Sequence, residues 1–572
     1  MRAGLKLPRV ARFSLPLILL VAVGFAGPCY AQTRPPFRGP GPQRLALLSQ
    51  GINLNAWFAP WANPAGYADS FGPDEAAFLV KAGFTFVRLP LDPDLLFDRD
   101  HPAVFRPAVR FVDTAVRMLL DAGLAVVLDP IHGSSDNARW ESALYHDAAF
   151  RAAAASYWES LARHYAAFSG DRIFFEIMNE PHLSAREKVD PSWWQGVQAG
   201  LAAAIRRGAP SNTIIATGER WGGIDGLLGL KPLPDSDVVY SFHYYEPMTF
   251  THQGASWTGP VQEELSGLPY PPNPTAIAAA EAAMADPRAR AQIARYAKEG
   301  WGPDRLRAGV ARAADWGRAH AVPVFCGEFG VYRKVAPAAD RLRWIGDLRA
   351  ALEADGIGWS MWDYETDFGI VRFAEPQWRR GPEVDAPCLA ALGLDPSASL
   401  AGGAGGASGA GKPTLADFVA GKTQLIVFPF TWWERLWTRE AGAGLESTVP
   451  DPSGAPASLR IEVKGSRDWS LPSGFRIAVR EGEHYSLSSK VLCSGALSPG
   501  LMFTSRDARG AVLSWDLGSK EAKAGSAGPI DLSTEVTIPP GVATIEPRWA
   551  GVGPLVAEFG DFEVRRLDPT AP

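Results

Sequence analysis

Cysteine is scarce in this sequence, with four residues in 572. Cys29 lies in an apolar N-terminal segment, which leaves Cys326, Cys388 and Cys493 for the folded protein. This odd number, with no Cys-x-x-Cys pair, excludes a disulfide framework and a cysteine-ligated zinc site. We expect at most one disulfide bond.

An excess of charge of one sign is also lacking. The net charge is −6 and the isoelectric point is about 5.9. The sequence therefore offers no basic field for nucleic acid and no polybasic patch for a membrane surface, and neutral substrates are expected. The length exceeds what one hydrophobic core normally organises, so we predict two domains.

Long apolar runs are absent after the N-terminus. Residues 13–27 form one such run, interrupted by Pro16, and small residues ending at Ala31 follow it. Four basic residues precede the run, namely Arg2, Lys6, Arg9 and Arg12. This pattern predicts a signal peptide over residues 1–31, cleaved near Ala31, and a secreted or periplasmic protein. No later segment reaches roughly 18 consecutive apolar residues, so we expect no stable membrane insertion.

Glycine and alanine dominate residues 401–413, AGGAGGASGAGKP, which predict a flexible linker. After it, residues 414–572 carry short β-type runs separated by glycine and proline, for example residues 458–463 and 485–492. These runs predict an all-β sandwich domain, jelly-roll-like in character. Residues 32–400 form the first domain.

The first domain alternates short apolar runs with helical stretches. The runs are continuously apolar, which is typical of parallel strands buried on both faces. Eight strands, each followed by a crossover, predict a (β/α)8 TIM barrel. The expected strands are residues 51–54, 84–89, 125–129, 173–178, 213–217, 238–242, 322–327 and 358–362.

Polar and aromatic residues gather where these strands end, which is the active face of such barrels. They are Arg88, Asp129, His132, Asn179, Glu180, His243, Tyr245, Glu328 and Trp362. Glu180 and Glu328 end the fourth and seventh strands and would face each other across the barrel mouth. Paired carboxyl groups of this kind cleave glycosidic bonds, one as the proton donor and one as the attacking group.

Six motifs in this order resemble glycoside hydrolase family 5, the cellulase family, over roughly residues 47–395. They are FVRLP, LDPIH, EIMNEP, FHYYEP, CGEFG and GWSMWDY. The resemblance implies a retaining double displacement with Glu180 as general acid and base and Glu328 as nucleophile. It also implies that Asn179 holds the sugar 2-hydroxyl, and that Arg88 and Tyr245 hydrogen-bond Glu328.

The same resemblance implies substrate contacts. His132 and His243 would line the cleavage subsite, with His243 tuning Glu180, and Trp362 would form a platform under the sugar ring. Trp57 and Trp257 are predicted as further stacking positions on the loops of this face.

Other chemistries lack their signatures. There is no HExxH motif, no HxH motif on the first strand and no G-x-S-x-G elbow, so we expect neither a metal nor a cofactor. Glu176 is interpreted as a buried structural carboxylate and Trp359 as a core residue.

The substrate is left open among β-linked polysaccharides. The motif FTHQGASW, within residues 246–301, resembles bacterial members called endoglucanases and favours an endo-β-1,4-glucanase. We expect a monomer. The alternatives are another β-glycanase acting on mannan, mixed-linkage or β-1,3-glucan, an exo-acting or transglycosylating enzyme of cell-envelope glucan, and a non-catalytic glycan-binding protein. Aromatic residues of the β-domain either fill its core or bind glycan: Trp432, Trp433, Trp437, Trp469, Tyr485, Trp515 and Trp549.

Overall fold

The computed structural model of the chain separates residues 37–572 from the N-terminal residues 1–36. The predicted signal peptide and linker lie outside the described residues, and so do His132, Trp432 and Trp433. The structure describes residues 37–62, 70–97, 102, 105, 108–130, 137–183, 190, 192–375, 380–400, 424–428, 436–440, 442–450, 456–473, 475–494, 497–523, 525 and 528–567.

Eight parallel strands close into a barrel in sequence order, which confirms the predicted (β/α)8 fold. They are β1 (Gln50–Asn53), β2 (Phe86–Leu91), β3 (Ala125–Pro130), β4 (Ile173–Glu176), β5 (Thr213–Thr217), β6 (Val238–Tyr244), β7 (Val324–Phe329) and β8 (Gly358–Met361). A two-stranded sheet of β9 (Val371–Glu375) and β10 (Arg380–Val384) follows the barrel.

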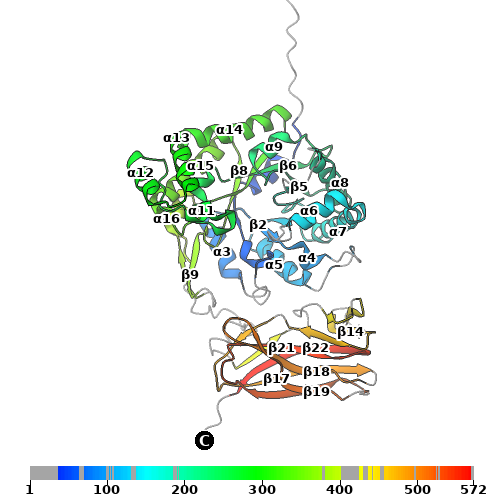
Figure 1. Cartoon of the computed structure of the whole chain (residues 1–572). Helices are drawn as coiled ribbons and strands as arrows, with labels where there is room; N and C mark the ends of the chain where they lie inside the picture. The colour runs from blue at the N-terminus through cyan, green and yellow to red at the C-terminus, as the bar shows by residue number, and fades with distance from the viewer. Residues whose placement is uncertain are drawn as a thin grey trace, which may run out of the picture. The chain divides into compact units, whose positions relative to one another are not determined.

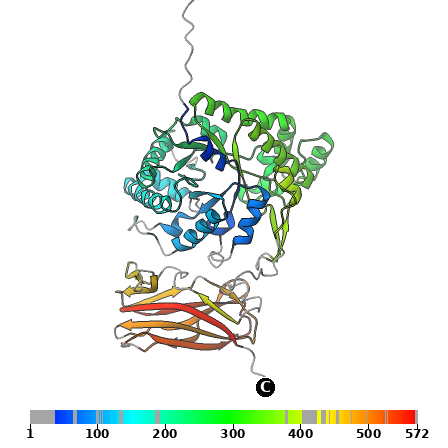
Figure 2. The same ribbon diagram turned by 180° about the vertical axis from the view of Figure 1, so that it is seen from behind.

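Helices surround these strands (Figures 1 and 2). The longest are α7 (Ala148–Ala166), α8 (Trp193–Gly208), α14 (Pro303–His320) and α15 (Ala338–Ala354). The others are α1 (Pro42–Leu47), α2 (Asn55–Phe58), α3 (Pro73–Ala82), α4 (Pro93–Leu96), α5 (Val109–Asp121), α6 (Asn137–His146), α9 (Ile224–Gly229), α10 (Met248–Thr251), η2 (Ser256–Thr258), α11 (Pro260–Glu264), α12 (Pro274–Ala283), α13 (Pro287–Glu299) and α16 (Ala386–Ala391). Helix α7 begins where the Asp147 carboxylate accepts from the backbone amides of Ala149 and Phe150, which satisfies two amides without a partner in the helix.

The barrel interior is layered. An apolar layer fills one end and consists of Leu48, Phe86, Ala125, Val127, Phe174, Ile215, Val239 and Phe325, all buried. Side chains two residues apart on a strand point to the same face, so the next layer is set by the following inward position. That layer is polar and buried, with Asn53, Arg88, Asp129, Glu176, Thr217, Ser241 and Ser360. The alternation of each strand therefore places charge directly above the apolar core.

The C-terminal region is a pair of antiparallel sheets, as predicted. One contains β13 (Gly444–Pro450), β14 (Pro456–Val463), β22 (Leu555–Leu567), β17 (His484–Ser494) and β20 (Ile530–Thr537), with β11 (Leu425–Phe428) paired to β22. The other contains β12 (Trp437–Thr438), β15 (Asp468–Pro472), β21 (Thr544–Val552), β18 (Gly500–Arg506) and β19 (Val512–Glu521), with β16 (Ile477–Ala478) paired to β21. Trp469 and Trp549 are buried and pack against Phe559 of the opposite sheet.

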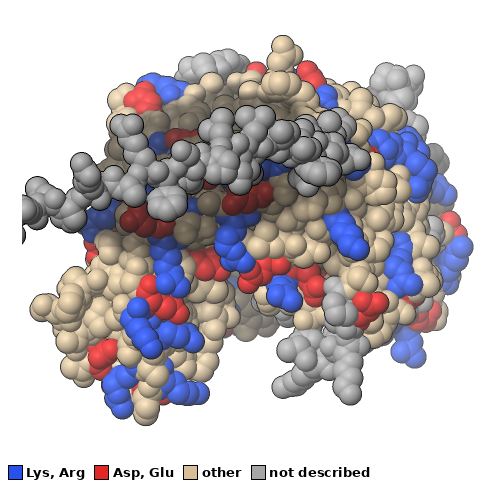
Figure 3. Space-filling model, turned by 90° about the horizontal axis from the view of Figure 1, so that it is seen from above, with Lys and Arg blue, Asp and Glu red and all other residues tan. Residues whose placement is uncertain are grey.

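Cys326, Cys388 and Cys493 are all buried and free of disulfide bonds. Among the described helices, none combines the length and the hydrophobicity that a membrane span requires. Figure 3 shows basic and acidic side chains interspersed on the face in view, in line with the near-neutral charge balance.

Candidate active site

Arg88 is the centre of a buried charge network at the mouth end of the barrel. Its Nε and Nη2 atoms donate to the two carboxylate oxygens of Glu176, at 2.7 and 3.0 Å. Nη1 donates to Glu328 at 2.7 Å, and Nη2 donates to the amide oxygen of Asn179 at 2.7 Å. Asp129 lies 3.0 Å from the same Nη2 atom. The guanidinium therefore links carboxyl groups from three strands.

One guanidinium faces three carboxyl groups in this network. Burial alone would lower the pKa of Arg88, but Asp129, Glu176 and Glu328 raise it well above its ordinary value. Burial raises the pKa of Asp129 well above the ordinary aspartate value, because the nearby arginine offsets only part of the desolvation. Asp129 is therefore a carboxyl group of this network whose charged form is strongly disfavoured by burial. Glu176 is a structural carboxylate, as interpreted from the sequence, and Thr217 also donates to it at 3.0 Å.

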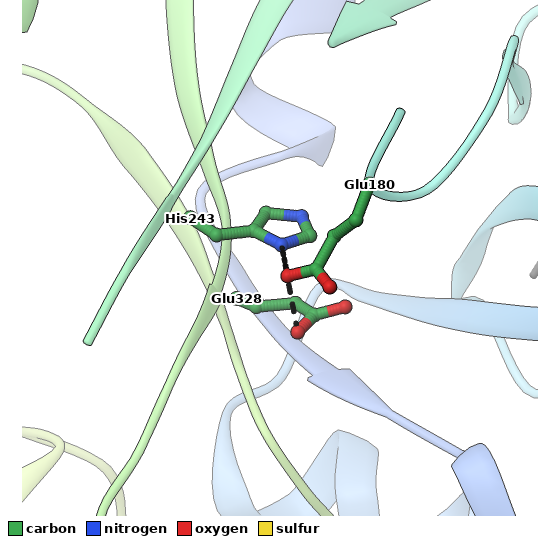
Figure 4. Close-up of side chains that lie close together, drawn as sticks. All are labelled: Glu180, His243 and Glu328. Carbon is green, nitrogen blue, oxygen red and sulfur yellow. Dashed lines mark hydrogen bonds and ion pairs between the residues drawn. The ribbon is translucent and has the colours of Figure 1, made fainter. Parts of the chain in front are cut away.

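One ring nitrogen of His243 faces both strand-end glutamates (Figure 4). Its Nδ1 atom is 2.8 Å from an oxygen of Glu180 and 3.6 Å from an oxygen of Glu328. The register between β6 and β7 shifts after Phe242, which aligns His243 with Glu328. A Cβ atom at Gly327 would lie 3.2 Å from the His243 ring, so glycine leaves room for the imidazole.

The side chains of Glu180, His243 and Glu328 form a compact cluster of titratable groups. One ligand atom from each lies within 4.8 Å of the others. These are also donor types that a metal ion accepts. Burial lowers the pKa of His243, but the two glutamates outweigh it and raise the pKa overall. A ring nitrogen that faces two carboxylates is suited to donate a hydrogen bond rather than to accept one.

Tyr245 supports Glu328 from the opposite side to Arg88. Its hydroxyl donates to the second oxygen of Glu328 at 2.9 Å. Burial raises the pKa of Glu328, and His243, Arg88 and the Tyr245 hydroxyl oppose that rise because each stabilises the carboxylate. Deprotonation of Glu328 therefore occurs at higher pH than for an exposed glutamate.

Tyr245→Phe is expected to move the acidic limb of the pH profile to higher pH. The variant loses a hydrogen bond to the ionised form of Glu328, so the proton is held more tightly and activity falls sooner as the pH decreases. A hydrogen bond to a charged group contributes about 1.5–3 kcal/mol, which corresponds to about one to two pH units. The measurement is kcat/KM against pH. Tyr364→Phe is the control, because the Tyr364 hydroxyl donates to Glu75 at 3.3 Å, and an equal shift in that variant would contradict the assignment.

Aromatic side chains line the rim beyond the glutamates. Trp362 follows β8 and lies edge-on to Trp61, with ring centroids 6.5 Å apart. Trp257, after β6, is exposed and contacts the rings of His252 and Tyr332. Both positions leave indole surface available to a ligand.

The prediction that Trp57 is an open stacking position is wrong. The structure places it in the core with 4% of its surface exposed, so it is not an open stacking platform. Helix α2 turns the indole onto Phe58, 4.8 Å away, and Phe71, 5.3 Å away. Trp61, four residues further on, takes the exposed position instead.

Trp221 is a rim residue that the sequence did not single out. It lies in the loop between β5 and α9, is 55% exposed and stacks on His182 with ring centroids 3.3 Å apart. Arg220 and Trp221 adopt φ angles of 63° and 59°, a conformation that is uncommon for residues other than glycine and that collects at functional sites. The His182 backbone amide donates to buried Glu141 at 3.1 Å, and its ring contacts the Glu180 carbonyl. The stack is therefore anchored beside Glu180.

A (β/α)8 barrel whose mouth presents two glutamates at opposing strand ends has the architecture of a glycoside hydrolase. Residues 49–367 match the cellulase family, glycosyl hydrolase family 5, and the chain belongs to that family.

Named relatives agree with this membership. Endoglucanase 3 of Fibrobacter succinogenes is 27% identical over 344 residues, which cover 57% of this chain and 51% of that protein. The chain thus spans about half the length of this relative. Endoglucanase C of Acetivibrio thermocellus is 26% identical over 334 residues, 57% of this chain and 94% of that protein. A solved structure described as an endoglucanase aligns with 61% of this chain and 98% of its own, with 22% identity and a TM-score of 0.49.

Proposed function

We propose that this chain is a secreted, retaining endo-β-1,4-glucanase. The observation that carries the proposal is the short separation of Glu180 and Glu328, whose nearest carboxylate oxygens lie within 4.8 Å of one another. Retaining glycosidases hold their two carboxyl groups roughly 5–5.5 Å apart, whereas inverting enzymes need roughly 6.5–9.5 Å to admit water. The spacing supports direct attack by one carboxylate on the anomeric carbon.

Glu328 is the nucleophile in this proposal and Glu180 the proton donor. Arg88 and Tyr245 each donate to one oxygen of Glu328, which stabilises the carboxylate needed for attack. Glu180 is the more exposed of the two glutamates, which suits a group that exchanges protons with the leaving oxygen and then with water. After departure of the leaving group, Glu180 removes a proton from water, and that water breaks the bond between the sugar and Glu328.

The remaining groups orient the sugar. Arg88 donates a hydrogen bond to the amide oxygen of Asn179. The two N–H groups of that amide are therefore left to donate to the sugar 2-hydroxyl. Trp362 forms the platform under the sugar that Glu328 attacks. Trp221, stacked beside Glu180, forms a second platform on the leaving-group side. His132 belongs to the same proposed cleavage subsite.

The substrate and the whole-chain organisation are part of the proposal. Two relatives named as endoglucanases support a glucan over mannan, and we propose β-1,4-glucan among the glucans. We propose a monomer with a signal peptide over residues 1–31, a catalytic domain over residues 32–400, a linker over residues 401–413 and an accessory β-domain over residues 414–572.

Product analysis on a polysaccharide panel tests this function. The mature chain is incubated with cellulose, mixed-linkage glucan, mannan, xyloglucan and β-1,3-glucan. We expect a rapid loss of viscosity on soluble β-1,4-glucan, with oligosaccharide products that retain the β-configuration at first release. Release of single sugars without viscosity loss would indicate an exo-acting enzyme, and longer products would indicate transglycosylation. Inverted products would overturn the roles given to the two glutamates.

A further inference from the structure

The sheet containing β12, β15, β21, β18 and β19 has an outer face that the opposite sheet does not cover. Strand alternation assigns its residues: buried Trp469, Leu501, Phe503 and Trp549 point inward, so their neighbours along each strand point outward. The outward set consists of Ser470, Met502, Thr504, Arg506, Glu546, Arg548 and Ala550, as the strand register places them. Met502, Thr504, Glu546 and Ala550 have at most 7% of their surface exposed, so they form the closed floor of this face. Labels in Figure 1 mark β18, β19 and β21.

Two exposed tryptophans lie at opposite edges of this outer face. Trp437 of β12 pairs with Ser470 and therefore shares its side of the sheet. Trp515 of β19 follows Ser514, which pairs with inward Ser505, so Trp515 also points outward. Their side chains are 51% and 57% exposed. Four strand spacings of about 4.8 Å separate β12 from β19, so the two indoles lie at edges roughly 19 Å apart.

Between the two indoles, the outward side chains are small at one end of the face and polar at the other. Level with Trp437, the outward positions on β15, β21 and β18 are Ser470, Ala550 and Gly500. Beside Trp515, the guanidinium groups of Arg548 and Arg506 lie 5.3 and 5.9 Å from the indole ring centroid. These cation–π contacts hold the ring in place, yet more than half of it remains open to solvent.

In the rest of the described chain, exposed tryptophan is found only at the barrel mouth. The other exposed tryptophans are Trp61, Trp221 and Trp257, and all three follow barrel strands on the active face. A single exposed apolar residue is common on a soluble protein, so the feature that indicates a ligand is the presence of two exposed indoles on one sheet face. Apart from the barrel mouth, the described residues expose tryptophan only on this sheet face.

We propose that this outer face is a second glycan-binding surface, and that a neutral β-linked glucan chain lies across the strands from Trp437 to Trp515. The indole faces pack against the C–H faces of the sugar rings, the small residues leave room for the chain, and Arg548 and Arg506 donate to sugar hydroxyls. The choice of glucan rests on the proposed function of the barrel. The surface holds the enzyme on insoluble substrate.

Binding is tested on the full mature chain carrying Glu328→Gln, so that the glycan is not degraded. Depletion onto amorphous cellulose and affinity electrophoresis in soluble mixed-linkage glucan compare the parent with Trp437→Ala, Trp515→Ala and the double variant. We expect the double variant to lose at least about tenfold in affinity, the scale on which an interface loses a central aromatic contact. The matched control is Leu445→Ala, which removes a 48% exposed apolar residue on β13 of the other sheet and should bind as the parent does.

Activity separates this inference from the function of the barrel. With Glu328 restored, the double variant should keep the parental kcat/KM on a soluble oligosaccharide and lose rate on insoluble cellulose only. Parental affinity in a double variant with an unchanged Tm would overturn the inference. Binding only to polygalacturonate, abolished by about 0.5 M salt, would also overturn it, because the surface would then be an anion site. Failure of the barrel to cleave any glucan would overturn the proposed function and leave the binding result to stand separately.

Discussion

Glu328→Gln is expected to reduce kcat on polysaccharide by on the order of 10⁵- to 10⁶-fold, the scale seen when a covalent nucleophile is removed from a hydrolase. Glutamine keeps an oxygen for the 2.7 Å hydrogen bond from Arg88, but it cannot form the glycosyl ester. Intact-mass measurement with a 2-fluoro glycoside that has a good leaving group should show labelling of the parent and none of the variant. Glu353→Gln, in a helix glutamate that accepts from Trp359, is the control and should keep full activity.

Stability should move in the opposite direction to activity in this variant. The pKa of Glu328 is raised in the folded state, so its contribution to stability is complete below the unfolded-state pKa and is lost as the pH rises through the folded-state pKa. At neutral pH the ionised carboxylate therefore costs folding free energy, and glutamine removes that cost. We expect a Tm equal to or above that of the parent at pH 7. A marked decrease in Tm would mean that Glu328 holds the barrel together, and the loss of activity would then not identify the nucleophile.

Glu180→Gln is expected to reduce the rate on natural polysaccharide by about 10²- to 10⁴-fold, the usual contribution of a general acid and base. A dinitrophenyl glycoside should partly restore the first step, because its leaving group departs without a proton. The second step should then limit the reaction and the glycosyl-enzyme should accumulate, because no base activates water. Azide, which needs no deprotonation, should release it as a glycosyl azide.

The comparison between the two variants provides the control. In Glu328→Gln no glycosyl-enzyme forms, so azide could act only by direct attack on the substrate and would give the α-glycosyl azide, whereas Glu180→Gln should give the β-glycosyl azide. Equal rescue of both variants, or full activity of Glu180→Gln on polysaccharide, would contradict the assigned roles.

Much of the catalytic domain could be predicted from the sequence because its signals are local. Each barrel strand is a short apolar run, and the functional residue lies near the end of that strand, as with Glu328 in β7, or a few positions after it, as with Glu180 four residues after β4. Because parallel strands of a closed barrel end on one face, eight local patterns are sufficient to bring Arg88, Asn179, His243 and Glu328 together. The structure confirms that they meet, through contacts of 2.7 and 2.8 Å.

Other features depended on which face of a segment was buried, and that is decided by distant parts of the chain. The sequence indicated Trp57 as a stacking platform, but the packing of α2 against Phe71 buries that residue, and Trp61 is exposed instead. Trp221 stacks on His182, a residue 39 positions earlier in another loop, and no local sequence pattern predicts this contact.

The sequence by itself therefore determined the barrel, the sandwich and the strand-end positions of the glutamates, because apolar periodicity and strand ends are properties of short segments. Only the tertiary structure decided the electrostatics around Arg88, since burial and three carboxyl groups from separate strands act on one guanidinium. It also decided which tryptophans of the β-domain are core and which are open: Trp469 and Trp549 face the opposite sheet, whereas Trp437 and Trp515 face solvent. Burial depends on the whole packed sheet, and a single strand does not contain that information.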